Sequence, residues 1–198
     1  MALQDIFAGC TQSPLLLAEP MTKHTSFHIG GPAELMAQPQ SEAELQSLLL
    51  KAAEAAVPVT LVGNGSNLLV RDKGIRGLVI KLGSMLRDIK VSGNVLTFGS
   101  GVSLAQASKK AAELGLSGME FAVGIPGSIG GAVYMNAGAY DGEMSKVVKS
   151  VRVMDAAGEV SELSAGELDF GYRHSALQGS GKIVTSVTVE LAAGDKQA

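Results

Sequence analysis

The sequence predicts an α+β fold built as two lobes, and three observations support this prediction. Before residue 85, one strongly amphipathic helix lies between extended segments, which is the pattern of a strand-helix-strand unit. After residue 85, short strands separated by turn residues indicate antiparallel hairpins. Glycine-rich loops follow strands in both parts. We therefore expect a lead-in at 1–21, a first lobe at 22–85, a second lobe at 86–193 and a tail at 194–198.

The first lobe is predicted from one helix and two strands. Ser41 to Ala56 forms the helix, because Ser41 caps it, Glu44 completes a capping box and Leu45, Leu48, Leu49, Ala52 and Ala56 share one face. Strands are expected at 57–62 and 77–82. Residues 1–20 show no periodicity and are expected to be loose or weakly helical. Residues 24–33 are expected to be extended and broken by Gly30-Gly31-Pro32.

The second lobe is predicted mainly from hairpins. Strands at 89–91 and 95–98 flank the turn at 92–94, and strands at 147–154 and 159–163 flank a second turn. A helix is expected from Ser103 to Leu114, with a Ser103/Gln106 capping box and Gly115 as its stop. A last strand is expected at 183–191, where apolar and polar residues alternate.

Composition excludes several classes of function. The formal net charge is −3, no basic run occurs and Trp is absent, so we expect no nucleic-acid partner. No apolar run approaches the roughly 18 residues that span a bilayer. Cys10 is the single cysteine, which rules out an internal disulfide or a thiolate metal cluster and fits a reducing compartment. We expect a cytoplasmic monomer that has no metal and no membrane partner.

The densest glycine-rich stretch runs from Gly118 to Gly142, with only Glu120 and Asp141 charged. Glycines let a backbone approach a ligand closely, and main-chain N–H groups can hold a phosphate without basic side chains. The alternative is a tight turn between two buried elements. His24 and His28 are candidate ligands or bases, but as isolated histidines without nearby carboxylates they are interpreted as structural.

Several motifs in order carry a family resemblance. They are Thr25–Ala33, Gly-Asn-Gly-Ser-Asn-Leu-Leu at 63–69, Gly-Ile-Pro-Gly-Ser-Ile-Gly-Gly-Ala at 124–132, Asn-Ala-Gly-Ala-Tyr at 136–140 and Phe-Gly-Tyr-Arg at 170–173. Together, from about residue 22 to 191, they closely resemble the UDP-N-acetylenolpyruvoylglucosamine reductases, the MurB enzymes of bacterial peptidoglycan synthesis. The resemblance implies a two-lobed FAD-binding domain of the PCMH/vanillyl-alcohol-oxidase type.

The resemblance also implies which residues bind FAD between the two lobes. The residues that would line the diphosphate are Gly63, Asn64, Gly65, Ser66 and Asn67, followed by Leu68. The residues that would line the flavin and its ribityl chain are Pro126, Gly127, Ser128, Gly130, Gly131, Ala132, Asn136, Ala137 and Gly138, with Gly101 also in the cofactor site and Ile183 meeting the isoalloxazine through its backbone.

The implied chemistry is hydride transfer from NADPH to the flavin and then to C3 of the enolpyruvyl group of a UDP-sugar. Negative charge then develops at C2 and on the neighbouring carboxylate, and an Arg suits its stabilisation because the guanidinium stays charged and grips a carboxylate. Arg173 is the catalytic candidate, and Tyr172 is expected to position the substrate. The alternative for Arg173 is a surface ion pair.

The sequence departs from the family in its length. The reductases carry a further C-terminal domain with a proton-donating Ser and a late Glu, and neither Ser175, Ser180 nor Glu190 matches those positions. We therefore expect a truncated FAD-binding fragment with little or no turnover. The alternative function is a non-catalytic module that binds a flavin or nucleotide on the same scaffold.

Overall fold

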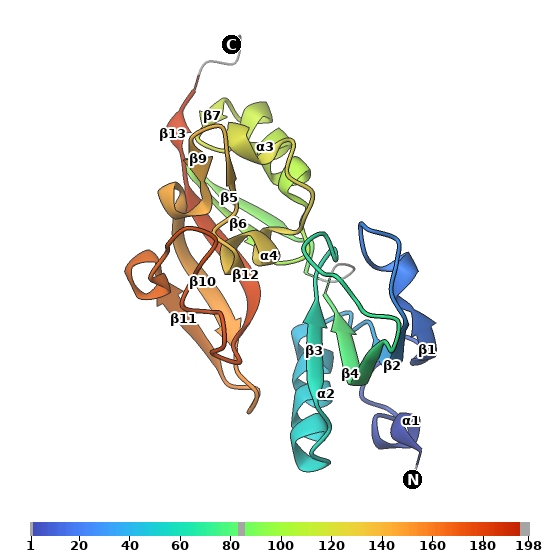
Figure 1. The fold of residues 1–198 in the computed structure, drawn as a ribbon. Helices are drawn as coiled ribbons and strands as arrows, with labels where there is room; N and C mark the ends of the chain where they lie inside the picture. Colours follow the sequence, from blue (N-terminus) through green and yellow to red (C-terminus); the bar gives the residue numbers. More distant parts are fainter. Residues whose placement is uncertain (1, 83–85, 195–198) are drawn as a thin grey trace. The chain divides into compact units, whose positions relative to one another are not determined.

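The computed structural model describes residues 2–82 and 86–194, and it divides into two compact units (Figure 1). Unit 1 comprises residues 1–85 with 156–159, and unit 2 comprises 86–155 with 160–198. Helices and strands are mixed in both units, as an α+β fold requires. The expected tail at 194–198 lies outside the described residues except for Gly194.

Unit 1 is built on a sheet with the strand order β1-β2-β4-β3. The strands are β1 (Leu16–Pro20), β2 (Pro32–Ala37), β3 (Val59–Val62) and β4 (Ile75–Lys81). β1 is antiparallel to β2, whereas β2 and β3 both run parallel to β4. Because parallel strands end at the same edge, the residues that follow β2 and β3 gather there, together with Leu82 after β4.

The N-terminal segment, expected to be loose or weakly helical, fits that expectation in its short helix but also contains a strand that was not predicted. It forms a short helix, α1 (Leu3–Ile6), and then β1, which joins the sheet by pairing with β2. The short 3-10 helix η1 (Met21–Lys23) follows, with Met21 fully buried. The expected extended segment at 24–33 becomes regular only at Pro32, where β2 begins.

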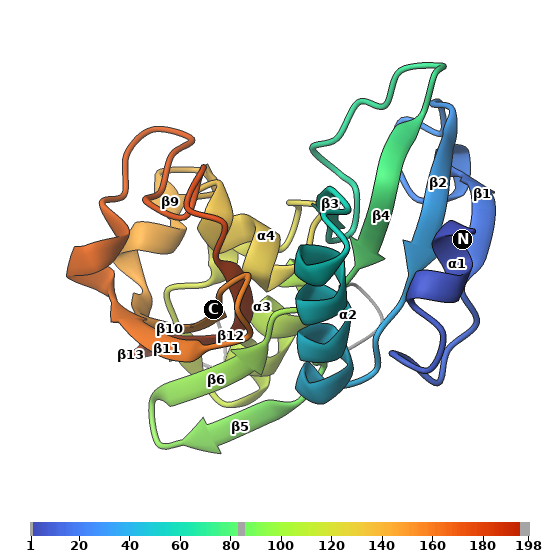
Figure 2. The same ribbon diagram turned by 90° about the horizontal axis from the view of Figure 1, so that it is seen from below.

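Helix α2 (Glu42–Glu54) confirms the predicted helix, and it lies along the sheet beside β3 and β4 (Figure 2). The backbone N–H of Glu44 donates to Ser41 Oγ at 3.2 Å, as expected of an N-cap. The predicted capping box is wrong in its second half. The Glu44 carboxylate accepts from Gln40 N at 2.9 Å and Thr11 Oγ1 at 2.8 Å, because these donors from the preceding chain draw it away from the Ser41 amide.

Unit 2 is built on an antiparallel sheet with the order β11-β10-β12-β6-β5. The predicted hairpins and last strand are confirmed. The strands are β5 (Ile89–Ser92), β6 (Val95–Gly99), β10 (Val148–Met154), β11 (Val160–Ser164) and β12 (Ile183–Glu190). The central strand β12 is almost wholly buried, and its residues Val184, Val187 and Val189 belong to the core of this unit.

Two helices accompany this sheet. α3 (Leu104–Glu113) confirms the predicted helix, since Ser103 and Gln106 form both bonds of the capping box and Gly115 follows at φ +69°. α4 (Ile129–Tyr134) packs against β12 and β6. Helix α4 lies inside the stretch that the sequence predicted to be a loop, so that prediction is wrong for these residues.

Short elements complete unit 2. β7 (Leu116–Ser117) pairs with β13 (Ala192–Ala193), and β8 (Gly138–Ala139) pairs with β9 (Gly142–Glu143). The 3-10 helices are η2 (Glu120–Ala122), η3 (Met144–Lys146) and η4 (Ala165–Leu168). Across residues 2–82 and 86–194, no helix is both long and apolar enough to cross a membrane.

Candidate functional site

In unit 1, the loop at 63–67 leaves the carboxyl end of β3, as the sequence predicted. Gly65 sits at φ +68°, and a Cβ on it would lie 2.0 Å from the backbone oxygen of His24. Its carbonyl accepts a hydrogen bond from Ser26 N at 3.2 Å. This glycine is therefore required by contact between two backbones of the protein, which fixes the loop on residues 24–26.

The amides of this loop remain available to a ligand. Within the described residues, no backbone N–H from Gly63 to Asn67 donates to a protein acceptor. The loop is partly exposed, with Gly65 buried and Asn64 and Asn67 exposed. Backbone N–H groups must find a partner when a surface becomes covered, and an anionic diphosphate supplies acceptors of that kind. The backbone here fits the diphosphate of a dinucleotide.

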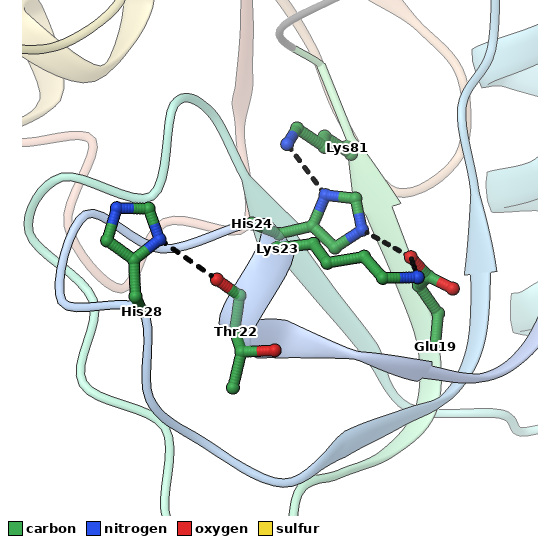
Figure 3. Close-up of polar contacts among 6 residues, drawn as sticks. All are labelled: Glu19, Thr22, Lys23, His24, His28 and Lys81. Atoms are coloured by element: carbon green, nitrogen blue, oxygen red, sulfur yellow. Dashed lines mark hydrogen bonds and ion pairs between the residues drawn. The ribbon is translucent and has the colours of Figure 1, made fainter.

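A polar cluster that the sequence interpretation missed lies next to this loop. Figure 3 shows its side chains. His24 Nε2 lies 2.9 Å from Glu19 Oε1, and His24 Nδ1 lies 2.8 Å from Lys81 Nζ. An ammonium group only donates, so Nδ1 accepts from Lys81 while Nε2–H donates to Glu19. The interpretation of His24 as a histidine without a carboxylate partner is wrong. Among the described residues, the ring of His28 forms a hydrogen bond to the backbone, between Nδ1 and the Thr22 carbonyl oxygen at 3.2 Å.

The surroundings shift the pKa values of two groups in this cluster, Glu19 and Lys81. The hydrogen bond from His24 is the main cause that lowers the pKa of Glu19 below its ordinary value of 4.5, against the opposing effect of burial. Burial lowers the pKa of Lys81. Lys23 adds an exposed ion pair to Glu19 at 3.4 Å, which contributes little by itself.

In unit 2, the structure brings two of the predicted glycine-rich loops together. Gly130 N donates to Ser100 O at 3.1 Å, Ile129 N donates to Val102 O at 2.8 Å, and Leu104 N donates to Gly127 O at 3.1 Å. A Cβ on Gly130 would lie 2.8 Å from the Cβ of Ser100. These contacts join the residues around Gly101 to the start of α4.

One buried polar atom in this region has no partner. Ser100 is 3% exposed, and among the described residues its Oγ makes no hydrogen bond. A buried hydroxyl normally has a hydrogen-bond partner, so an unpaired one beside the predicted flavin loops is compatible with a polar ligand. The predicted residues nearby are mostly covered: Ala132, Asn136, Ala137 and Ile183 are buried, and Ile183 begins β12 opposite Met154.

The Phe-Gly-Tyr-Arg motif forms a tight turn. Gly171 and His174 exchange two backbone hydrogen bonds of 3.1 Å, which leaves Tyr172 and Arg173 at the tip. Tyr172 is 95% exposed and Arg173 is also exposed. Arg173 has φ +54°, a left-handed conformation that is uncommon for residues other than glycine and marks a locally constrained backbone.

This turn is held by two buried side chains, one of which, Asn136, comes from the glycine-rich stretch. Asn136 Nδ2 donates to Gly171 O at 3.0 Å, while Asn136 Oδ1 accepts from Ser145 N at 3.0 Å. Ser175 Oγ donates to the backbone carbonyl oxygen of Tyr134 at 2.8 Å. The arrangement fixes the backbone of Arg173 while its side chain stays exposed. In the part of the chain that the structure describes, the guanidinium forms no ion pair, so the surface ion pair considered from the sequence is not observed.

Comparison with known proteins identifies the family. The sequence pattern of the family described as "FAD binding domain" matches residues 33–164, which is more than half of the chain. The chain belongs to this family. The predicted resemblance to the reductases is also confirmed. UDP-N-acetylenolpyruvoylglucosamine reductase of Pediococcus pentosaceus is 48% identical over 97% of this chain, and that of Lactococcus lactis subsp. cremoris strain MG1363 is 51% identical over 89%.

The chain spans 64% and 59% of the length of these two relatives. The crystal structure of the reductase MurB from Thermus caldophilus matches with a TM-score of 0.78 and 35% identity, over 93% of this chain and 64% of that one. p-Cresol methylhydroxylase matches with a TM-score of 0.71 at 15% identity, over 98% of this chain and 43% of that one. The last match shows a shared fold, which confirms the predicted PCMH type.

Proposed function

We propose that this chain binds FAD and forms the flavin-binding part of an enzyme that reduces UDP-N-acetylglucosamine enolpyruvate to UDP-N-acetylmuramate with NADPH. The observation that carries the proposal is the turn at 171–174, which presents Arg173 without an ion-pair partner among the described residues. The turn is held by Asn136 of the glycine-rich stretch, and the chain is 48% identical to a UDP-N-acetylenolpyruvoylglucosamine reductase. The reaction would belong to peptidoglycan precursor synthesis in the cytoplasm.

In this proposal, the loop amides at 63–67 bind the diphosphate of FAD, and the residues from Pro126 to Gly138 line its flavin part. FAD, when bound, supplies hydride transfer. Arg173 binds the carboxylate of the enolpyruvyl group and stabilises the negative charge that develops when C3 accepts hydride. Tyr172, at the tip of the same turn, orients the substrate.

The test uses the chain in two lengths. The 198-residue chain is purified and titrated with FAD, and bound flavin is measured by absorbance and fluorescence. A version extended to the full length of the relatives is assayed for NADPH oxidation that depends on the enolpyruvyl sugar. An extended protein that binds FAD without substrate-dependent oxidation would favour the non-catalytic flavin-binding module. A protein that cannot be reconstituted with FAD would exclude both functions.

A further inference from the structure

One cavity of unit 1, with a volume of about 310 Å³, has an unusual lining. It combines two lysines, two histidines, two hydroxyl side chains and one amide, with no carboxylate among its lining residues. Such a lining offers hydrogen-bond donors and positive charge, which is the chemistry that recognises a phosphate. The lining residues are Lys23, His24, Thr25, Ser26, His28, Asn64 and Lys81.

This cavity borders the loop whose amides are free. Asn64 belongs to both the loop and the cavity. Lys81 is the last residue of β4 and pairs in register with Val62, the residue that immediately precedes Gly63. The next residue, Leu82, donates its N–H to Val62 O at 2.8 Å, which fixes that register. The parallel pairing therefore places Lys81 at the strand end from which the loop departs.

The ammonium of Lys81 is held in place while its charge stays unpaired. One of its hydrogens is donated to His24 Nδ1 at 2.8 Å, and His24 is in turn anchored by Glu19 at 2.9 Å (Figure 3). Across the described residues, no carboxylate lies within ion-pair distance of Lys81. A partly buried cation without an anionic partner is costly, and a bound phosphate would remove that cost.

We propose that Lys81 is the cation of the diphosphate site: its ammonium, positioned by His24 and Glu19, binds phosphate oxygens of FAD that the amides of Gly63–Asn67 also hold. This inference rests on the proposed function. Lys81 would supply the positive charge that the glycine-rich loops themselves lack. Lys81 contacts the ligand, and His24 and Glu19 act through it as positioning residues.

The test measures FAD binding to the 198-residue chain by quenching of flavin fluorescence at several salt concentrations. Loss of one charged hydrogen bond predicts that Lys81→Met weakens FAD binding roughly 10- to 100-fold and makes it less dependent on salt. Lys81→Arg retains most of the affinity. Lys51→Met is the matched control: it removes a lysine from α2 that forms an exposed pair with Glu54, and binding is unchanged.

Two further measurements complete the test: competition by inorganic pyrophosphate and FAD binding to a His24 variant. Pyrophosphate competes with FAD for the wild-type chain and competes more weakly for Lys81→Met. His24→Leu keeps the lysine charge but removes its anchor, so affinity falls less than in Lys81→Met while the salt dependence stays steep. Circular dichroism confirms that each variant is folded, and Lys81→Gln replaces Lys81→Met if the latter is not.

Two results overturn different proposals. If Lys81→Met binds FAD and pyrophosphate like the wild type, with the same salt dependence, Lys81 is not part of the site, although FAD binding stands. If the wild-type chain binds neither FAD nor pyrophosphate, the proposed function fails together with this inference.

Discussion

Replacement of Gly65 by Ala tests whether the loop at 63–67 is fixed by contact between backbones. Gly65 has φ +68°, and the added Cβ would lie 2.0 Å from the backbone oxygen of His24. The left-handed conformation alone costs an alanine about 1–2 kcal/mol. Because the clashing atom belongs to the backbone, residues 24–25 must shift, which adds about 1–3 kcal/mol. We expect Gly65→Ala to lower the free energy of unfolding by about 2–5 kcal/mol.

Gly9→Ala is the matched control for this prediction. Gly9 belongs to the same unit, has φ +80° and has nothing within 4 Å of its added Cβ. It therefore carries the conformational cost of about 1–2 kcal/mol without the clash. Urea unfolding followed by circular dichroism measures both variants, since the chain has no Trp for fluorescence. Equal destabilisation by the two substitutions would refute the claim that packing on His24 fixes this loop.

Three further predictions concern the other parts of the structure. Asn136→Ala removes two hydrogen bonds, one to Gly171 O in the turn at 171–174 and one from Ser145 N, and lowers the free energy of unfolding by about 2–4 kcal/mol. Asn94→Ala, which loses one bond to Leu191 O at 2.9 Å, costs about 1 kcal/mol, and similar values for both variants in urea unfolding would contradict this prediction. The pKa of Glu44 is lowered chiefly by the Gln40 amide, so its contribution to stability is present above its ordinary value of 4.5 and is lost as pH falls through the lowered folded value. The stability advantage of the wild type over Glu44→Gln should therefore shrink as pH falls below 4.5, and an advantage that stays constant as the pH falls would count against it. In the extended enzyme, Arg173→Ala should lower turnover about 10²–10³-fold with flavin content unchanged, and parallel losses of both would make Arg173 structural.

The sequence predicted those elements whose signals are local. Ser103 and Gln106 mark the start of α3 within four residues, and the turn at Gly93 joins two strands that pair with each other. β1 was missed because its five residues carry no alternation of apolar and polar side chains, and they become a strand only by pairing with β2. α4 was missed because glycines at 130 and 131 disfavour a helix that packing on β12 and β6 stabilises.

The candidate site was predictable to a different degree in each part. The family resemblance located the loops, but it could not show that Asn136 supports the turn that carries Arg173, since these residues are far apart in the chain. The cluster at His24 was missed only in part for the same reason, because its carboxylate partner Glu19 is near in the chain and was overlooked, whereas Lys81 is distant. Lys81 lies 57 positions away from His24 in the chain. The pairing of β3 with β4 places Lys81 beside the loop at 63–67, and this loop in turn packs on residues 24–26. Knowledge of that strand register would have indicated that Lys81 lies beside the loop at 63–67.

The glycines of the two units have a role that their number alone does not indicate. Dense glycine was first interpreted as access for a ligand to the backbone. At Gly65 and Gly130, however, the space of the missing side chain is taken by the protein itself, by His24 O in one case and by Ser100 in the other. Gly65 and Gly130 therefore allow backbone contacts that fix the loops before any ligand binds. In this fixed shape, the amides at 63–67 have no acceptor among the described residues of the protein. A site fixed in this way loses little conformational entropy on binding. Ligand affinity should then depend on the neighbouring charge of Lys81 more than on loop ordering, which is why substitution of that lysine is the sharper test of the diphosphate site.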